Sequence, residues 1–258
     1  MKTIAINSIK GGSGKSTLTL MVIRVLTALG FKCLAIDADS SNHSLSFFLN
    51  DKEEINPIQS KTIFHLFMDG IIRDCICYIN ENLDLISGDV RLNEFRSTDS
   101  LKRLKRSLQE VDYDYAIIDT SPTYDNIIGN VLTASDILLI PVQQDLFSFL
   151  ALRYQFEKLA DLELSDLDTH IIFNQFDMPR NDNQGTYLNQ ITNLFLEDEI
   201  FKPFINPNRI SRSSVYRKYI NKKEYKIDTR METAKAHGEI ENLVQSILGT
   251  EAKEGLNG

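Results

Sequence analysis

The chain has 258 residues, of which 42% are apolar and 25% charged, and its formal net charge at pH 7 is -8. This length and apolar content are enough for a sizeable core, and one globular domain is the default expectation. The acidic balance argues against a protein that coats nucleic acid over its whole surface, but it allows a local basic patch. No run approaches the roughly 18 apolar residues of a membrane span, and the N-terminus shows no signal-peptide pattern, so we expect a cytoplasmic protein.

The three cysteines, Cys33, Cys75 and Cys77, are odd in number, and none lies in a C-x-x-C pair or a zinc-binding spacing. This usage is typical of reduced thiols in a reducing compartment. We therefore expect buried or incidental cysteines rather than metal ligands.

Short apolar runs alternate with amphipathic segments along the chain. Six of these runs are expected to be buried strands: residues 3–7, 33–37, 83–87, 115–119, 137–142 and 170–174. Runs that are apolar on both faces suit a parallel sheet covered by helices. Between the first two runs, apolar residues recur at three- and four-residue steps from Leu18 to Leu29, and Gly30 follows as a helix stop. We therefore predict one doubly wound α/β domain over residues 1–250, with a mainly parallel sheet and helices on both faces, and a flexible tail at 251–258.

A glycine-rich stretch, "NSIKGGSGKSTLTL", covers residues 7–20 between the first predicted strand and the first predicted helix. Glycines allow positive backbone dihedrals, so successive N–H groups can turn inward around phosphate oxygens at the helix N-terminus. Lys15 would then reach the β- and γ-phosphates, and the Ser16 hydroxyl would bind Mg²⁺. A tight turn alone would explain the glycines but not the Gly-Lys-Ser that follows. The residues expected to bind nucleotide here are Gly11, Gly12, Ser13, Gly14, Lys15, Ser16 and Thr17.

The usual phosphate-loop pattern G-x-x-x-x-G-K-[ST] has a glycine where this chain has Ile9. The core K-G-G-x-G-K-[ST] instead resembles the deviant Walker A loop of the ParA/MinD family of P-loop ATPases, with a first lysine at Lys10. In that family this lysine reaches across a nucleotide-sandwich homodimer to the partner's ATP. The resemblance therefore implies that Lys10 and Lys15 serve two different nucleotides, whereas the simpler alternative for Lys10 is a solvated surface lysine.

The segment Asp37-Ala38-Asp39, at the end of the second predicted strand, resembles the D-x-D of the same family. The resemblance implies that Asp39 orients the attacking water and that Asp37 supports the metal. Strand-end aspartates are also common helix caps, which is the alternative for Asp37. Where the family often continues with Pro-Gln, this chain has Ser40-Ser41-Asn42.

Residues 112–143 resemble the Walker B strand of the family and the segment after it. Asp119 ends the buried apolar run and would hold Mg²⁺, usually through water, while residues 120–122 would begin switch II. The stretch "IIFNQFD", residues 171–177, resembles the strand whose asparagine meets the adenine, here Asn174; a polar strand-end cap is the alternative. The stretch "INPNRISRSS", residues 205–214, resembles a segment near the base and the dimer interface and places Pro207 there.

The segment from 209 to 235 holds nine basic and three acidic residues, with Tyr216, Tyr219 and Tyr225 between them. A basic stripe with aromatics on an acidic protein predicts contacts with the phosphate backbone of double-stranded DNA, without sequence preference. A solvated helix face is the alternative. The residues predicted to bind DNA are Arg209, Arg212, Arg217, Lys218, Lys222 and Lys223.

The resemblance implies an ATPase that uses ATP and Mg²⁺, dimerises with ATP, associates with the nucleoid and segregates plasmid or chromosomal cargo. A ParB-like adapter would stimulate slow hydrolysis and release the dimer from DNA. A membrane-associated regulator like MinD is an alternative, but it needs an amphipathic membrane-seeking tail, and the end of this chain is acidic and without aromatics. Positioning of a protein cargo is another. A metabolic or iron–sulfur relative would need paired cluster cysteines beyond the sheet, whereas Cys75 and Cys77 are only two residues apart.

Overall fold

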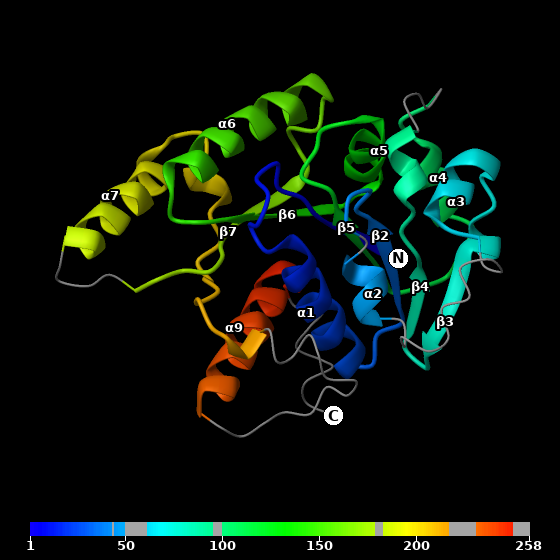
Figure 1. Ribbon diagram of the computed structural model, residues 1–258, viewed down its shortest axis with the longest axis horizontal. Helices are drawn as coiled ribbons and strands as arrows, with labels where there is room; N and C mark the ends of the chain where they lie inside the picture. Colours follow the sequence, from blue (N-terminus) through cyan, green and yellow to red (C-terminus); the bar gives the residue numbers. More distant parts are fainter. Residues whose placement is uncertain (43, 50–60, 95–99, 179–182, 217–230, 250–258) are drawn as a thin grey trace.

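We describe a computed structural model of the chain, covering residues 1–42, 44–49, 61–94, 100–178, 183–216 and 231–249. Within these residues a seven-stranded sheet crosses the molecule in the order β3-β4-β2-β5-β1-β6-β7 (Figure 1). All neighbouring strands pair in parallel except β3 and β4, which are antiparallel. The strands are β1 (Lys2–Ile6), β2 (Cys33–Ala38), β3 (Ile76–Asn80), β4 (Leu83–Ile86), β5 (Tyr115–Thr120), β6 (Ile137–Val142) and β7 (Asp168–Phe173).

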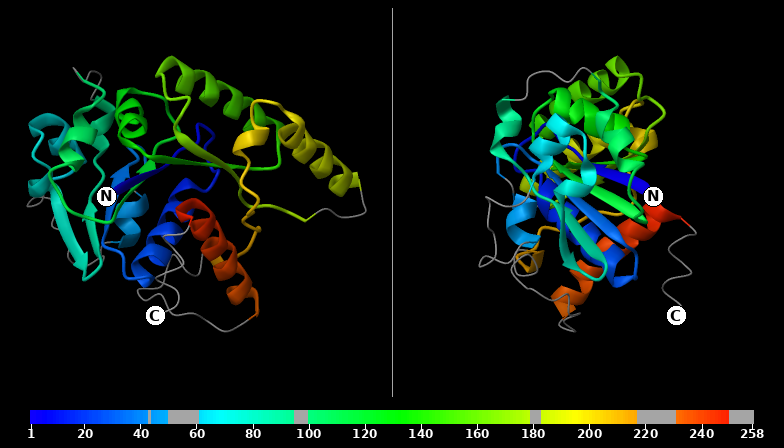
Figure 2. Two further views of the ribbon diagram at one scale, coloured as in Figure 1. Left: turned by 180° about the vertical axis from the view of Figure 1, so that it is seen from behind. Right: turned by 90° about the vertical axis from the view of Figure 1, so that its right-hand side faces the viewer.

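Helices cover both faces of the sheet, as the side view in Figure 2 also shows. One face packs against α1 (Lys15–Ala28), α2 (Ser44–Leu49) and α9 (Met231–Leu248). The other packs against α3 (Ile63–Asp69), α4 (Arg103–Leu108), α5 (Asn126–Ala134), α6 (Leu146–Asp161) and α7 (Asn183–Glu197). Short 3-10 turns complete the described elements: η1 (Ile72–Cys75), η2 (Val90–Glu94) and η3 (Lys202–Phe204). The predicted doubly wound α/β fold is confirmed.

The central strands are buried on both faces of the sheet, which explains why apolar runs in the sequence predicted their positions. Along β1, Ala5 belongs to one core cluster, while Ile4 and Ile6 belong to the other, because successive side chains of a strand point to opposite faces. Every residue of β2, β5 and β6 is buried. A strand buried on both faces is apolar over most of its length, and the buried polar residues of β2 and β5 stand near their carboxyl ends. All six predicted strands are present.

The edge strand β3 was not predicted. Its residues are half-buried to exposed, Tyr78 is 75% exposed, and the pairing with β4 shifts register between Tyr78 and Asn80. Its first four residues, Ile76 to Ile79, are apolar, but the strand lies at the edge of the sheet and is partly open to water. The predicted helix from Leu18 starts earlier, at Lys15, because the glycine loop leads directly into its first turn.

The remaining sequence expectations concern the cysteines, membranes and the tail. Cys33 and Cys75 are buried free thiols, and burial raises the pKa of Cys33 to about 12. Among the helices of the described segments, none combines the length and the apolar character that crossing a membrane requires. The tail predicted at 251–258 lies outside the described residues.

Candidate functional site

The glycine loop connects the carboxyl end of β1 to α1, at the edge of the sheet where the parallel strands end. Gly12 and Gly14 have positive φ angles of 75° and 90°, and Gly14 caps α1 in the left-handed conformation. A Cβ atom on Gly14 would lie 2.3 Å from Nδ2 of Asn174. Glycine at position 14 is therefore required both by the backbone angle and by the approach of Asn174.

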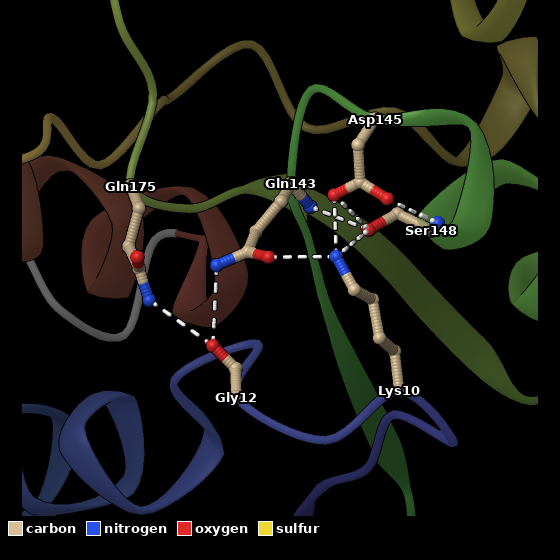
Figure 3. Close-up of polar contacts among 6 residues, drawn as sticks. All are labelled: Lys10, Gly12, Gln143, Asp145, Ser148 and Gln175. Atoms are coloured by element: carbon tan, nitrogen blue, oxygen red, sulfur yellow. Dashed lines mark hydrogen bonds and ion pairs between the residues drawn. The ribbon is translucent and has the colours of Figure 1, made fainter.

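The carbonyl groups of the loop are held by side-chain amides from the ends of β6 and β7. The Gly12 carbonyl accepts hydrogen bonds from Nε2 of Gln143 at 3.1 Å and Nε2 of Gln175 at 3.2 Å (Figure 3). The Ser13 carbonyl accepts one from Nδ2 of Asn174 at 2.6 Å. With these carbonyls engaged by amides, the loop can present its N–H groups to an anion, as phosphate-binding nests do.

Lys15 stands in the first turn of α1 and is 7% exposed. Burial lowers the pKa of its ammonium group, while the charges of Asp119 and Asp39 oppose that change. A buried cation between two carboxylates at a helix N-terminus suits a multiply charged anionic ligand.

Asp119 is the residue before the last in β5, in register with Ile6 of β1 and Asp37 of β2. Its side chain is fully buried, and Oδ2 has no hydrogen-bond partner among the described residues. Oδ1 lies 3.2 Å from the Thr19 hydroxyl. Burial raises the pKa of Asp119 to about 7 and the neighbouring aspartates add to this, while a hydrogen bond from Ser16 and the charge of Lys15 oppose it.

An unpartnered, buried carboxylate oxygen is unfavourable unless a cation or an ordered water satisfies it. Together with the nearby Ser16 hydroxyl, Asp119 offers the hard oxygen ligands that Mg²⁺ prefers. The residues present therefore fit a magnesium ion beside the glycine loop. The buried hydroxyl of Ser13 is likewise without a hydrogen-bond partner in the described part of the chain, and it stands in the same loop.

Asp37 is buried, and its carboxylate accepts hydrogen bonds at both oxygens. The Asp39 amide donates to Oδ1 at 3.2 Å, and the amide and hydroxyl of Ser46 donate to Oδ2 at 2.8 and 2.7 Å. The Ser46 hydroxyl in turn accepts from the Gly88 amide at 2.8 Å, which joins this loop to the end of β4. Asp37 thus anchors the start of α2, as its cap-like alternative suggested, and its role at the metal stays a prediction.

Asp39 is 4% exposed and lies at the end of the same strand segment. Its Oδ1 accepts from the Ser41 amide at 2.8 Å and the Ser41 hydroxyl at 2.5 Å, which fixes the side chain in its loop. Its charge acts on both Lys15 and Asp119, so it belongs to the same electrostatic site. A fixed carboxylate at this place is suited to orient a water molecule.

A pocket of about 300 Å³ lies beside Gly14 and Asn174. Thr17 and other residues of α1 form one side, the segment 210–214 with Tyr216 forms another, and Ile240 of α9 also contributes. Its position next to the loop and its mixed lining suit a nucleoside. The predicted segment 205–214 thus reaches the pocket through its second half, whereas Pro207 is exposed and is not part of the lining.

Lys10 does not point toward the glycines that follow it in the loop (Figure 3). Its ammonium group donates to Oε1 of Gln143 at 2.7 Å, to the Asp145 carboxylate and to the Ser148 hydroxyl at 3.2 Å (Figure 3). The side chain is 23% exposed. The alternative of a solvated surface lysine therefore does not describe it.

The comparison with protein families decides the assignment. Residues 1–171 match the family model AAA_31, described as an AAA domain. The chain belongs to the ParA/Soj family of ATPases. Soj of Bacillus subtilis strain 168, a sporulation initiation inhibitor protein, is 30% identical over 234 residues, which covers 85% of this chain and 90% of Soj.

Two solved structures extend the ParA family likeness to the whole fold. A plasmid partition protein from Borrelia burgdorferi B31, bound to AMPPNP, has a TM-score of 0.76 at 25% identity and covers 95% of this chain and 98% of its own. A variant of McdA from Cyanothece in complex with ATP has a TM-score of 0.80 at 25% identity, and 96% of each chain is covered. This chain is an ATP-binding ParA-family partition or positioning ATPase, whose cargo could be a plasmid, a chromosome or a protein.

Of the six residues predicted to bind DNA in this ParA-family protein, two lie in the described part of the chain, Arg209 and Arg212. Arg209 is exposed, and its guanidinium lies 4.6 Å from the centre of the Phe176 ring. Arg212 lines the nucleoside pocket and pairs with Asp177 at 2.9 Å. Arg217, Lys218, Lys222 and Lys223 lie outside the described residues.

Sequence reasoning missed four polar residues that shape this ParA-family site: Gln143, Asp145, Ser148 and Gln175. Each follows closely on a predicted strand, β6 or β7. Since ligands of such sheets bind beyond the carboxyl ends of the strands, the position of these residues was the available signal.

Proposed function

We propose that this chain is a partition ATPase that forms a homodimer around two ATP molecules and binds double-stranded DNA without sequence preference. It would segregate plasmid or chromosomal cargo, and hydrolysis stimulated by a ParB-like adapter would release it from DNA. The observation that carries the proposal is the pair of lysines in one loop: Lys15 is buried beside Asp119, while Lys10 is directed away to the end of β6.

The roles of the residues at one ATP follow from the site. The loop backbone and Lys15 would bind the phosphates, with Asn174 and Thr17 beside the nucleoside pocket. Ser16 and Asp119 would hold Mg²⁺, which neutralises charge on the phosphate oxygens when bound. Asp39 would orient the attacking water and accept its proton, because its carboxylate is fixed close to Lys15 and Asp119.

The nucleotide chemistry is tested with three variants in the same assays. Lys15→Ala should lose ATP binding, whereas Asp39→Ala should keep ATP binding and dimerisation but stop turnover, because only the water-orienting carboxylate is removed. Lys10→Ala should bind ATP but fail to dimerise with it, since the phosphate cradle is intact. Calorimetry, phosphate release and sedimentation velocity measure the three steps. Hydrolysis by Asp39→Ala at the wild-type rate would exclude Asp39 from the reaction.

DNA binding is tested by fluorescence anisotropy with duplexes of unrelated sequence, with and without ATP. Binding should require ATP, because the dimer brings two weak basic surfaces together, and log affinity should fall linearly with log salt. Changing Arg217, Lys218, Lys222 and Lys223 to glutamate should weaken binding to every duplex and reduce the salt slope. If the wild type ignores DNA but sediments with anionic liposomes in ATP, the membrane-regulator alternative replaces this proposal.

A further inference from the structure

The ammonium group of Lys10 is saturated within its own protomer. An ammonium group has three N–H donors, and three acceptors surround this one: Gln143, Asp145 and Ser148 (Figure 3). All three acceptors come from the short stretch that joins β6 to the first turn of α6. We call these three residues the Lys10 seat.

The seat is held together by its own hydrogen bonds, apart from those that Lys10 makes. Asp145 is the N-cap of α6, and its Oδ1 accepts from the Ser148 amide at 2.9 Å. The Ser148 hydroxyl donates to Oδ2 of Asp145 at 3.1 Å and accepts from the backbone N–H of Gln143 at 3.2 Å. Ser148 is 3% exposed, so the corner is packed as well as bonded. A rigid corner of this kind can bind an ammonium group without first rearranging.

The charge of the seat matches its occupant. Partial burial raises the pKa of Asp145, but hydrogen bonds from Lys10 and Ser148 outweigh that, so the pKa lies below its ordinary value. The carboxylate is therefore ionised at neutral pH. Gln143 also donates to the Gly12 carbonyl, so the seat and the phosphate loop share one side chain.

The same ammonium group cannot fill the seat and bind the phosphates of a second protomer, because all its donors are in use. We propose that Asp145, together with Gln143 and Ser148, retains Lys10 in the free protomer, so that the nucleotide of a second copy must displace Asp145 from Lys10 before the dimer closes. This inference rests on the proposed cross-subunit role of Lys10. Asp145 is then a positioning residue that sets how readily the ATP dimer forms.

The test replaces Asp145 with asparagine, which caps helices as well as aspartate does but carries no charge. Dimerisation is measured by sedimentation velocity in Mg²⁺ and AMPPNP over a range of protein concentrations. We expect Asp145→Asn to dimerise at about tenfold lower protein concentration than the wild type, because a charge-assisted hydrogen bond no longer opposes release of Lys10. The affinity of the protomer for AMPPNP, measured at concentrations below dimerisation, should be unchanged.

A matched control is Asp161→Asn, which removes an ion pair with Lys158 at the other end of the same helix and should leave dimerisation as in the wild type. The double variant Lys10→Ala/Asp145→Asn should behave like Lys10→Ala, since the seat has no occupant to release. A merely structural effect of Asp145→Asn would persist in the double variant and would overturn the proposal.

The outcomes separate the seat from the proposed function. If Lys10→Ala dimerises like the wild type, the cross-subunit role is wrong and the seat proposal is wrong with it. If Lys10→Ala fails to dimerise but Asp145→Asn needs as much protein as the wild type, or more, the cross-subunit role stands and the seat proposal alone is overturned.

Discussion

Replacing Asp119 with asparagine should stabilise the nucleotide-free protein and weaken its response to Mg²⁺ and nucleotide. Burial raises the pKa of this carboxyl from 3.8 to about 7, which corresponds to about 4 kcal/mol of free energy disfavouring the ionised form in the folded protein. Asparagine removes that charge, but its NH₂ group needs a new acceptor, which offsets about 1–3 kcal/mol. We therefore expect a net gain of about 1–3 kcal/mol in the free energy of unfolding above neutral pH.

The stability difference between Asp119→Asn and the wild type should increase with pH. The folded protein keeps the Asp119 proton up to about pH 7, whereas the unfolded chain loses it near pH 4. The favourable contribution of protonated Asp119 is thus present below about pH 4 and is lost as the pH rises to about 7. The stability advantage of Asp119→Asn should widen by about 2–3 kcal/mol between about pH 5 and about pH 8.

Urea unfolding of both proteins in the presence of EDTA, at the two pH values, measures this difference. The weaker response to Mg²⁺ and nucleotide is measured as a thermal shift with Mg²⁺ and AMPPNP, because a ligand that binds only the folded state stabilises it. The wild type should gain stability from the ligand and Asp119→Asn should gain little. An advantage that does not change with pH, or a variant less stable than the wild type at the higher pH, would refute the reasoning about this carboxylate.

Other substitutions probe the loop and its surroundings. Gly14→Ala should abolish nucleotide binding in calorimetry and lower stability by about 1–3 kcal/mol, since its Cβ would meet Asn174 and its φ angle is 90°; normal binding would show that the loop can adapt. Ser46→Ala should lower the free energy of unfolding by about 1–2 kcal/mol, because Asp37 and the Gly88 amide each lose a partner. Ser46→Thr, which keeps a hydroxyl, should recover part of that loss, and equal stability of Ser46→Ala and wild type would contradict the role given to Asp37.

The sequence was most informative where one short segment carries a whole structural requirement. The central strands are buried on both faces and are apolar up to their carboxyl ends, and Gly14 is required by the angle of its own backbone. Other features depend on residues far apart in the chain. The contact of Lys10 with Asp145 spans 135 positions, and no local pattern encodes it. Edge strand β3 was missed although Ile76 to Ile79 form an apolar run, because so short a run does not by itself distinguish a strand from a buried helix segment.

Asp37 shows a third case, in which the sequence located the residue but left two roles open. A strand-end aspartate can bind a metal or cap a helix, and the sequence alone does not distinguish these two roles. The structure shows Ser46, nine residues later, as the donor to its Oδ2. Only the course of the loop between them decides which groups meet, and that course depends on packing around β4 and α2.

The packing of α1 has a consequence for synthesis of the protein. This helix carries Lys15, and its apolar face shares a core cluster with α9, whose residues leave the ribosome last among the described elements. During translation, Leu18 and Met21 cannot pack against Ile240 and its neighbours until α9 has left the ribosome. Contacts between residues distant in sequence form only after the later partner has emerged. The glycine loop is therefore synthesised early, but the helix that follows it is packed only when α9 is present. A nascent chain of this kind should acquire nucleotide binding only after α9 has emerged from the ribosome and packed against α1.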